Sequence, residues 1–237
     1  MIIDHHDENT VLEILYRDEY CIAIHKPSAM LVHRTQICPD RVVALQLLRD
    51  QIGQFVHPVH RLDRATSGIL LFTFDKENLV KFKHMFENRQ VSKTYICLCR
   101  GWAEDAGHID NPLKVENKEE KVEAISDYKT LFKAEKPWPC GPYETSRYSL
   151  IEVKPQHGRM HQIRRHMNHI MHPIIGDTNY GDGRHNANFR SRVDIHRMML
   201  QATELSFTHP VTQEEIHIHS PADDDFQKAA ASLGCTL

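Results

Sequence analysis

Short apolar runs bounded by turn-forming residues predict a series of strands along the chain. Between residues 10 and 33, such runs are separated by the polar groups RDEY and KPSAM. Pro27 has no backbone N–H to donate, so the second break is predicted to be a loop rather than part of a central strand. Further strands are predicted at residues 69–74, 91–99, 147–155, 199–210 and 214–221, the last two forming a hairpin.

Helical spacing of apolar residues marks four other stretches. In residues 40–53, four apolar side chains fall on one helical face, with Asp40 as the predicted N-cap and Gly53 as the stop. The other helices are predicted at residues 75–90, with Asp75 as the cap, at residues 158–170, and in a short tail from residue 223.

Interspersed strands, helices and hairpins predict an α+β fold with a mixed, mainly antiparallel sheet. Residues 103–147 are polar and poorly periodic, and the proline-rich segment at 135–146 within them is predicted to be a loop. The chain carries no internal repeat and no low-complexity linker. The simplest division of its 237 residues is therefore one catalytic domain, residues 1–237.

Composition narrows the class of protein. No apolar run approaches the roughly 20 residues that a membrane-spanning helix needs. The N-terminal residues are acidic and polar, without the features of a secretory signal. The six cysteines are scattered and form no CxxC pair, which fits a reducing compartment. We therefore expect a cytoplasmic protein without a membrane partner.

Charge is unevenly distributed along the chain. The net charge is −3, but residues 154–197 hold eight Lys and Arg side chains against three Asp. Local basicity sets the field that a phosphate backbone experiences, so this stretch is a candidate nucleic-acid surface. The alternative is an ordinary solvated surface.

Asp63 is the first candidate for chemistry. It lies between Arg61 and Arg64, directly before a turn and a predicted buried strand. Two neighbouring arginines favour an ionised carboxylate, which is a poor base at neutral pH but can attack an electrophilic carbon. The alternative is a structural salt bridge at a turn, which is the commoner role of a lone Asp between arginines.

A second candidate cluster follows Gly158. Arg159, His161, Gln162 and Arg164 stand at the start of a predicted helix, where they suit binding of a phosphate or the edge of a planar base. His161 and His166 lack the spacing and the glutamate of a zinc-binding helix, and no metal is expected. The alternative is a basic surface helix.

These motifs together resemble one family, the RluA-type pseudouridine synthases. The resemblance lies in KPSAMLVH, HRLDRATSG before an apolar strand, KTY about thirty residues later, GRMHQIRRH, HPIIGDTNYG and MLQATELSFTHP. It covers about residues 12–220. The fold implied is the pseudouridine synthase fold, with a sheet flanked by helices and a central RNA-binding cleft. The short length and the lack of an N-terminal S4 domain make the chain most similar to the branch that modifies tRNA.

The resemblance implies an activity and roles for individual residues. Uridine in RNA would be isomerised to pseudouridine, most simply a uridine of the position 65 type in the acceptor and T-stem region of tRNA. Asp63 would be the essential carboxylate, either as nucleophile or as the base that forms a glycal, and Arg164 its salt-bridge partner. Tyr95 would stack beneath the uracil and help to remove the C5 proton.

Other motif residues would serve RNA. Arg61 would fill the place vacated by the flipped base. The remaining predicted RNA- and uridine-binding residues are His60, Thr66, Ser67, Gly68, Arg159, His161 and Gln162. The reaction needs no cofactor, and RNA is the only partner expected, with the protein as a monomer.

Three alternatives remain open from sequence. They are an rRNA substrate, an RNA-binding module without catalysis, and a nucleoside or glycoside hydrolase. The last would need a second carboxylate, and inside the motifs only Asp177 offers one. One departure from the family pattern is Ala29, where Gly is usual. If this loop needs a positive φ, alanine costs about 1 kcal/mol there.

Overall fold

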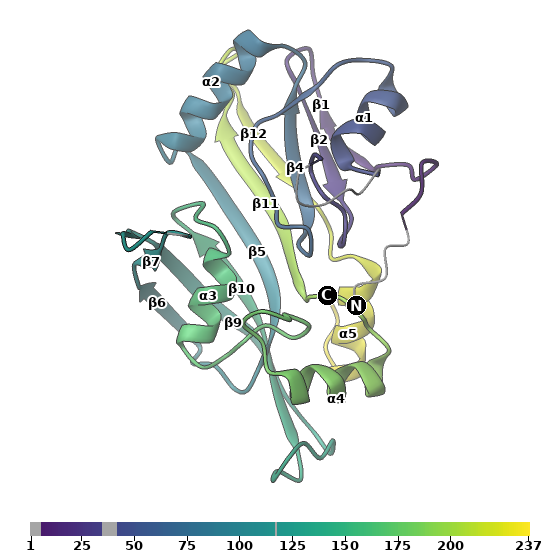
Figure 1. Ribbon diagram of the computed structural model, residues 1–237, viewed down its shortest axis with the longest axis vertical. Coiled ribbons are helices and arrows are strands. Elements are labelled where there is room, and N and C mark those ends of the chain that lie inside the picture. Colours follow the sequence, from purple (N-terminus) through teal and green to yellow (C-terminus); the bar gives the residue numbers. More distant parts are fainter. Residues whose placement is uncertain (1–5, 35–41, 117) are drawn as a thin grey trace. The chain divides into compact units, whose positions relative to one another are not determined.

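The chain forms two compact units that are interleaved in sequence. The computed structural model describes residues 6–34, 42–116 and 118–237. Unit 1 comprises Met1–Lys93 and Ala202–Ser220, and unit 2 comprises Thr94–Gln201 and Pro221–Leu237. The boundary therefore falls inside two strands, β5 (Val91–Arg100) and β11 (Leu200–Thr208) (Figure 1).

Unit 1 is built on strands paired in the order β1, β2, β4 and β11. Two further strands extend this arrangement: β3 pairs with β4, and β12 pairs with β11. The bounds are Ile14–Arg17 for β1, Cys21–Lys26 for β2, His57–Pro58 for β3, Ser67–Thr73 for β4 and Glu215–His219 for β12. All seven residues of β4 are buried, as expected for a strand with neighbours on both edges. The predicted hairpin is confirmed, because β11 and β12 pair in antiparallel register.

Helices α1 (Ala44–Ile52) and α2 (Lys76–Glu87) complete unit 1. The predicted stop of α1 is confirmed, because Gly53 adopts a left-handed conformation at its C-cap. The predicted N-cap was wrong: Asp40 lies outside the described residues, and Val43 occupies the cap without a side-chain bond. The Asp75 cap of α2 is confirmed, since its carboxylate accepts the backbone N–H of Asn78 at 2.7 Å.

The apolar core of unit 1 joins the two ends of its sequence. Strands β2 and β4 and helix α2 provide its early part, while β11 and β12 provide Leu205, Phe207, Ile216 and Ile218. Phe82 and Phe207 meet edge to face with ring centroids 5.9 Å apart. The core formed by α2 and the N-terminal strands is thus completed by residues more than a hundred positions later.

Unit 2 has its own strand order, β5, β10, β9 and β6. The bounds are Ser146–Pro155 for β10, Ile125–Lys136 for β9, Ala106–Asp110 for β6, and Leu113–Lys114 and Lys121–Val122 for the small pair β7 and β8. No strand was predicted in the poorly periodic residues 103–134, where the structure has β6 to β9, while the loop predicted at 135–146 is confirmed apart from its ends, since β9 ends at Lys136 and β10 begins at Ser146. Strand β9 has few buried side chains, so its sequence carries little apolar periodicity.

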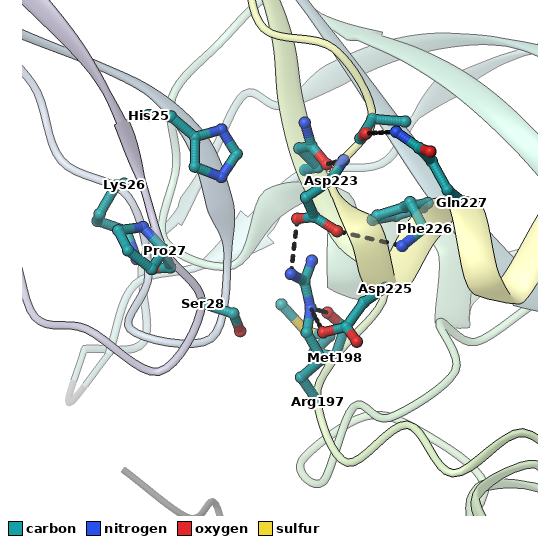
Figure 2. Close-up of polar contacts among 12 residues, drawn as sticks. His25, Lys26, Pro27, Ser28, Arg197, Met198, Asp223, Asp225, Phe226 and Gln227 are labelled. Atoms are coloured by element: carbon teal, nitrogen blue, oxygen red, sulfur yellow. Dashed lines mark hydrogen bonds and ion pairs between the residues drawn. The ribbon is translucent and has the colours of Figure 1, made fainter. Parts of the chain in front are cut away.

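Three helices belong to unit 2. They are α3 (Gln162–His169), α4 (Gly183–Val193) and α5 (Asp224–Leu233). Helix α5 confirms the predicted C-terminal helix, and Figure 2 shows Asp223 at its start, accepting the backbone N–H of Phe226 and the Nη1 hydrogen of Arg197. Helix α4 was not predicted. The α+β class is confirmed, and none of the helices in the described parts of the chain is long and apolar enough to cross a membrane.

Candidate active site residues

The turn that carries Asp63 lies directly before β4 in unit 1. The backbone N–H of Thr66 donates to the carbonyl of Asp63 at 3.1 Å, which closes the turn. The Asp63 side chain is half-buried and Arg61 is exposed, so both are accessible to a ligand. The side chains of Thr66 and Ser67 are buried, which places them under the turn rather than on its surface.

The KPSAM loop is hydrogen-bonded to the turn that carries Asp63. Lys26 is fully buried, and its Nζ donates to the carbonyls of Pro27 at 2.7 Å, Met30 at 2.9 Å and Arg64 at 3.3 Å. The Ser28 hydroxyl donates to the carbonyl of Ala65 at 2.8 Å. Buried charged groups persist only when such partners are present. Lys26 is thus a central support of the Asp63 turn.

Two backbone positions around the turn have special conformations. Ala29 has φ +64°, so this loop does require a positive φ at the position where the family usually has Gly, and the Ala29 carbonyl accepts a hydrogen bond from Arg64 Nε at 2.9 Å. Gly68 has φ +107°, and a Cβ added there would overlap with the backbone of Ala202 in β11. Only glycine fits where β4 approaches β11 this closely.

His60 is held by the protein on both sides of its ring. Its Nε2 accepts the backbone N–H of Leu71 at 3.2 Å, and its ring stacks on Phe86 with centroids 4.9 Å apart. Burial lowers the pKa of His60 to about 4. His60 is therefore neutral and its contacts with Leu71 and Phe86 hold the start of the Asp63 turn in place. Its predicted contact with RNA stays a prediction.

The lowered pKa of His60 predicts a pH-dependent stability. Between pH 6.5 and about 4, His60 is protonated in the unfolded chain but stays neutral in the folded chain. The free energy of unfolding therefore falls as the pH falls through this window. In His60→Gln, whose amide oxygen can still accept from Leu71, this loss should shrink. Urea unfolding at about pH 7.5 and about pH 5 measures it, with the exposed His84→Gln as control. An equal pH dependence in all three proteins would contradict the assignment.

Tyr95 lies on β5 in unit 2, opposite Val153 of β10, and is half-buried. A position between two paired strands fixes its backbone, while partial exposure leaves part of the ring accessible. Lys93 stands two residues earlier on the same face of the strand. Burial lowers the pKa of Lys93 to about 8, a perturbation that sequence alone did not indicate.

The start of α3 gathers the second predicted cluster. Gln162 is buried, and its Nε2 donates to the carbonyl of Ile125 at 2.8 Å and to the Ser126 hydroxyl at 3.0 Å, which ties α3 to β9. Because its side-chain amide is occupied by these two bonds, Gln162 is better suited to supporting the start of α3 than to contacting RNA directly. Arg159 is exposed and available to a polyanion, although its Nε also donates to the Glu123 carbonyl at 3.1 Å.

His161 occupies a left-handed backbone conformation, φ +55°, at the N-cap of α3. Its Nδ1 lies 3.1 Å from the hydroxyl of Tyr180, and the two rings meet edge to face. Non-glycine residues in this conformation are uncommon and concentrate where surrounding contacts hold them, often at functional sites.

Arg164 is buried and forms a two-pronged ion pair with Asp177. Nε donates to Oδ2 at 2.7 Å and Nη2 to Oδ1 at 2.9 Å. Asp177 Oδ1 also accepts the backbone N–H groups of Asn179 and Tyr180. These donors keep the pKa of Asp177 below its usual value although burial opposes them. Asp177 is therefore a structural anion in a turn, and the pairing of Arg164 with Asp63 stays a prediction.

Asn186 of α4 fixes the turn that presents Asp177. Its Oδ1 accepts the backbone N–H of Gly176 at 2.8 Å, and its Nδ2 donates to the Asp177 carbonyl at 2.8 Å. A Cβ at Gly176 would overlap with the carbonyl of Arg197, the residue that binds Asp223 at the start of α5 (Figure 2). Lys26, Asn186 and Tyr180 were missed from sequence, because nothing in their neighbours' pattern signals these contacts.

A possible metal-binding trio lies elsewhere in unit 1. Ligand atoms of Asp18, Cys21 and His209 come within 4.8 Å of one another. His209 Nδ1 accepts the backbone N–H groups of Val211 and Thr212, so Nε2 carries the proton in a neutral ring and faces Asp18 Oδ2 at 3.3 Å. A protonated nitrogen cannot bind a metal, and the trio is better described as a close polar contact between the histidine and the Asp18 carboxylate.

Comparison with known proteins identifies the family. Residues 20–169 match the family model described as RNA pseudouridylate synthase. A tRNA pseudouridine synthase C from Vibrio parahaemolyticus is 46% identical over 92% of this chain and 93% of its own length. The Haemophilus influenzae protein of the same name is 42% identical over 94% and 98%.

Solved structures agree at the level of the fold. Human RNA pseudouridylate synthase domain containing 4 superposes with a TM-score of 0.74 at 21% identity, covering 94% of this chain and 93% of that one. Its counterpart, domain containing 1, gives 0.73 at 23% identity, covering 93% and 86%. From these matches, the chain belongs to the RNA pseudouridylate synthase family.

Proposed function

We propose that this protein isomerises uridine to pseudouridine at a defined position of tRNA. The observation that carries the proposal is 42–46% identity, over nearly the full length of both chains, to relatives named tRNA pseudouridine synthase C. Family membership implies an RNA substrate. The acceptor and T-stem region is the expected target, and we expect a monomer acting in the cytoplasm.

Asp63 is proposed as the catalytic carboxylate. In the reaction the N1–C1′ bond of uridine breaks, C5 forms the new bond to C1′, the C5 proton leaves and N1 gains a proton. No electrons are exchanged with another reactant. A carboxylate can assist either by attacking C1′ or by removing a ribose proton to give a glycal. Both routes need Asp63 to be fixed, and the brace formed by Lys26, Ser28 and Arg64 supplies rigidity.

RNA recognition is proposed for the exposed residues near these motifs. Arg61 is exposed two residues before Asp63 and can occupy the stack that the target base leaves. Arg159 lies exposed at the start of α3 and can contact a phosphate. His161 and Gln162 hold the surrounding backbone and, by the same proposal, shape the uridine site from beneath.

Tyr95→Phe is expected to slow turnover by about 100-fold while leaving the affinity for RNA unchanged, because the ring remains for stacking but the hydroxyl that assists proton removal is lost. Single-turnover release of tritium from C5-labelled uridine measures the step directly. The control is Tyr143→Phe, since Tyr143 is 66% exposed on the segment that joins β9 and β10. An unchanged rate in Tyr95→Phe would exclude a role for its hydroxyl.

The proposed function is tested by tritium release from an unmodified tRNA transcript labelled at C5 of uridine, followed by mapping of the modified position. Wild type should release tritium and Asp63→Ala should not. Release only from rRNA would favour the rRNA alternative. Binding of RNA by both proteins without release from any RNA would favour a module without catalysis.

A further inference from the structure

A pocket in unit 2 opens beside the loop that leads into α4. It has a volume of about 560 Å³ and is lined by Arg100 at the end of β5, by Asn168 in the last turn of α3, by Met171 and Pro173 after that helix, and by residues 180–184. This volume is in the range of sites that hold a small ligand or one nucleotide. The roles described above for Asp63, Tyr95 and Arg164 make no use of it.

The charges lining the pocket favour an anion. Asp182 is the only acidic residue in the lining, and its charge is already engaged. Its Oδ2 accepts Arg100 Nη1 at 2.6 Å, and its Oδ1 accepts the backbone N–H groups of Arg184 and His185. These donors hold the pKa of Asp182 below its usual value, so it stays ionised and paired. Arg184 then adds a second, uncompensated guanidinium.

Arg184 has a free guanidinium in the described parts of the chain, where no residue forms a hydrogen bond or ion pair with its side chain. It stands in the first turn of α4, an eleven-residue helix whose N-terminal residues Asp182, Gly183 and Arg184 belong to the lining. Gly183 beside it has open space where a Cβ would be, so a ligand can approach the backbone closely. A fork of free N–H donors beside a helix start is suited to phosphate.

The rest of the lining suits a nucleotide better than a bare anion. Asn168 is exposed, and its amide forms no hydrogen bond with the described residues, so it can pair with a base edge or a ribose hydroxyl. Met171 is 70% exposed and offers an apolar contact. Tyr180 joins this pocket to the start of α3, because its hydroxyl meets His161 and its ring lies 5.2 Å from the Arg164 guanidinium carbon.

We propose that this pocket is a second RNA subsite, which holds one nucleotide of the substrate other than the target uridine and binds its phosphodiester through Arg184. The inference rests on the proposed function and deepens it. A remote contact of this kind strengthens the ground state and the transition state equally, so it acts on substrate affinity rather than on the chemical step.

The test compares Arg184→Ala and Arg184→Glu with Arg190→Ala, which removes an exposed arginine from the last turn of the same helix. With the C5-tritiated tRNA transcript, Arg184→Ala should raise KM by about fivefold and leave kcat within about twofold, and Arg184→Glu should raise KM further. Filter binding at several salt concentrations should give a slope of log affinity against log salt that is smaller by about one in Arg184→Ala.

Each outcome bears on the proposal. KM and salt slope in Arg184→Ala equal to those of Arg190→Ala would overturn it. A second result would also overturn it: the salt slope of Arg184→Ala equals that of wild type, and inorganic phosphate raises the melting temperature of wild type but not of Arg184→Ala. The pocket would then bind a free anion rather than RNA. Failure of the proposed function is distinguishable, because wild type itself would then release no tritium. The filter-binding arm still tests the subsite in that case.

Discussion

Replacing Asp63 by Asn is expected to reduce pseudouridine formation by about 10⁴-fold or more, because the amide can neither attack C1′ nor accept a ribose proton. The fold should persist. The turn is closed through the Asp63 carbonyl rather than its side chain, and Asn matches Asp in shape. Single-turnover tritium release measures the loss, with thermal unfolding and RNA binding recorded on the same preparations.

Asp105→Asn is the matched control, since Asp105 lies on the surface with its side chain 96% exposed. It should retain the wild-type rate. Residual isomerisation by Asp63→Asn above about 1% of wild type, confirmed in a preparation checked for deamidation, would remove Asp63 from the essential role proposed for it.

Arg164→Ala is expected to lower the free energy of unfolding by about 3–5 kcal/mol, because the buried Asp177 carboxylate loses both bonds to the guanidinium. Asp177 would keep only backbone donors in a setting that is 1% exposed. Urea unfolding measures the change. The control is Arg100→Ala, whose pair with Asp182 is about one-third exposed and should contribute at most about 1 kcal/mol.

This ion pair also changes how Arg164 must be tested for catalysis. A lower melting temperature cannot establish a bond to Asp63, since the loss of Asp177's partner already destabilises the protein. The double variant Arg164→Met, Asp177→Asn removes both charges, and the Asn oxygen can still accept the N–H groups of Asn179 and Tyr180. Stability should largely return, and activity should not if Arg164 serves Asp63. Recovery of both would limit Arg164 to a structural role.

Local signals in the sequence predicted the elements that have strong caps and apolar faces. Asp75 and Asp223 cap α2 and α5, and Gly53 ends α1, because each makes or permits contacts within a few residues of itself. The exposed β9 was missed since its order comes from pairing with β10 and β6 rather than from its own pattern.

The candidate site shows the same division between local and distant information. Motif resemblance assigned roles to Asp63 and Tyr95 by position in the sequence. The three carbonyls around Lys26 Nζ and the two bonds from Asn186 to the Asp177 turn depend on tertiary approach. Hydrophobic periodicity and secondary-structure propensity describe neighbours along the chain and not contacts between distant residues, so only the structure reveals these contacts.

The interleaving of the two units has a consequence for biosynthesis. The first 93 residues leave the ribosome well before β11 and β12, yet the core of unit 1 includes Leu205, Phe207, Ile216 and Ile218. Until those strands emerge, β4 lacks its β11 neighbour. An apolar strand that is buried in the folded protein is then exposed, with backbone groups unpaired along the edge that β11 would cover. Synthesis halted before residue 205 would therefore release a nascent chain that cannot complete its first core and is prone to aggregate.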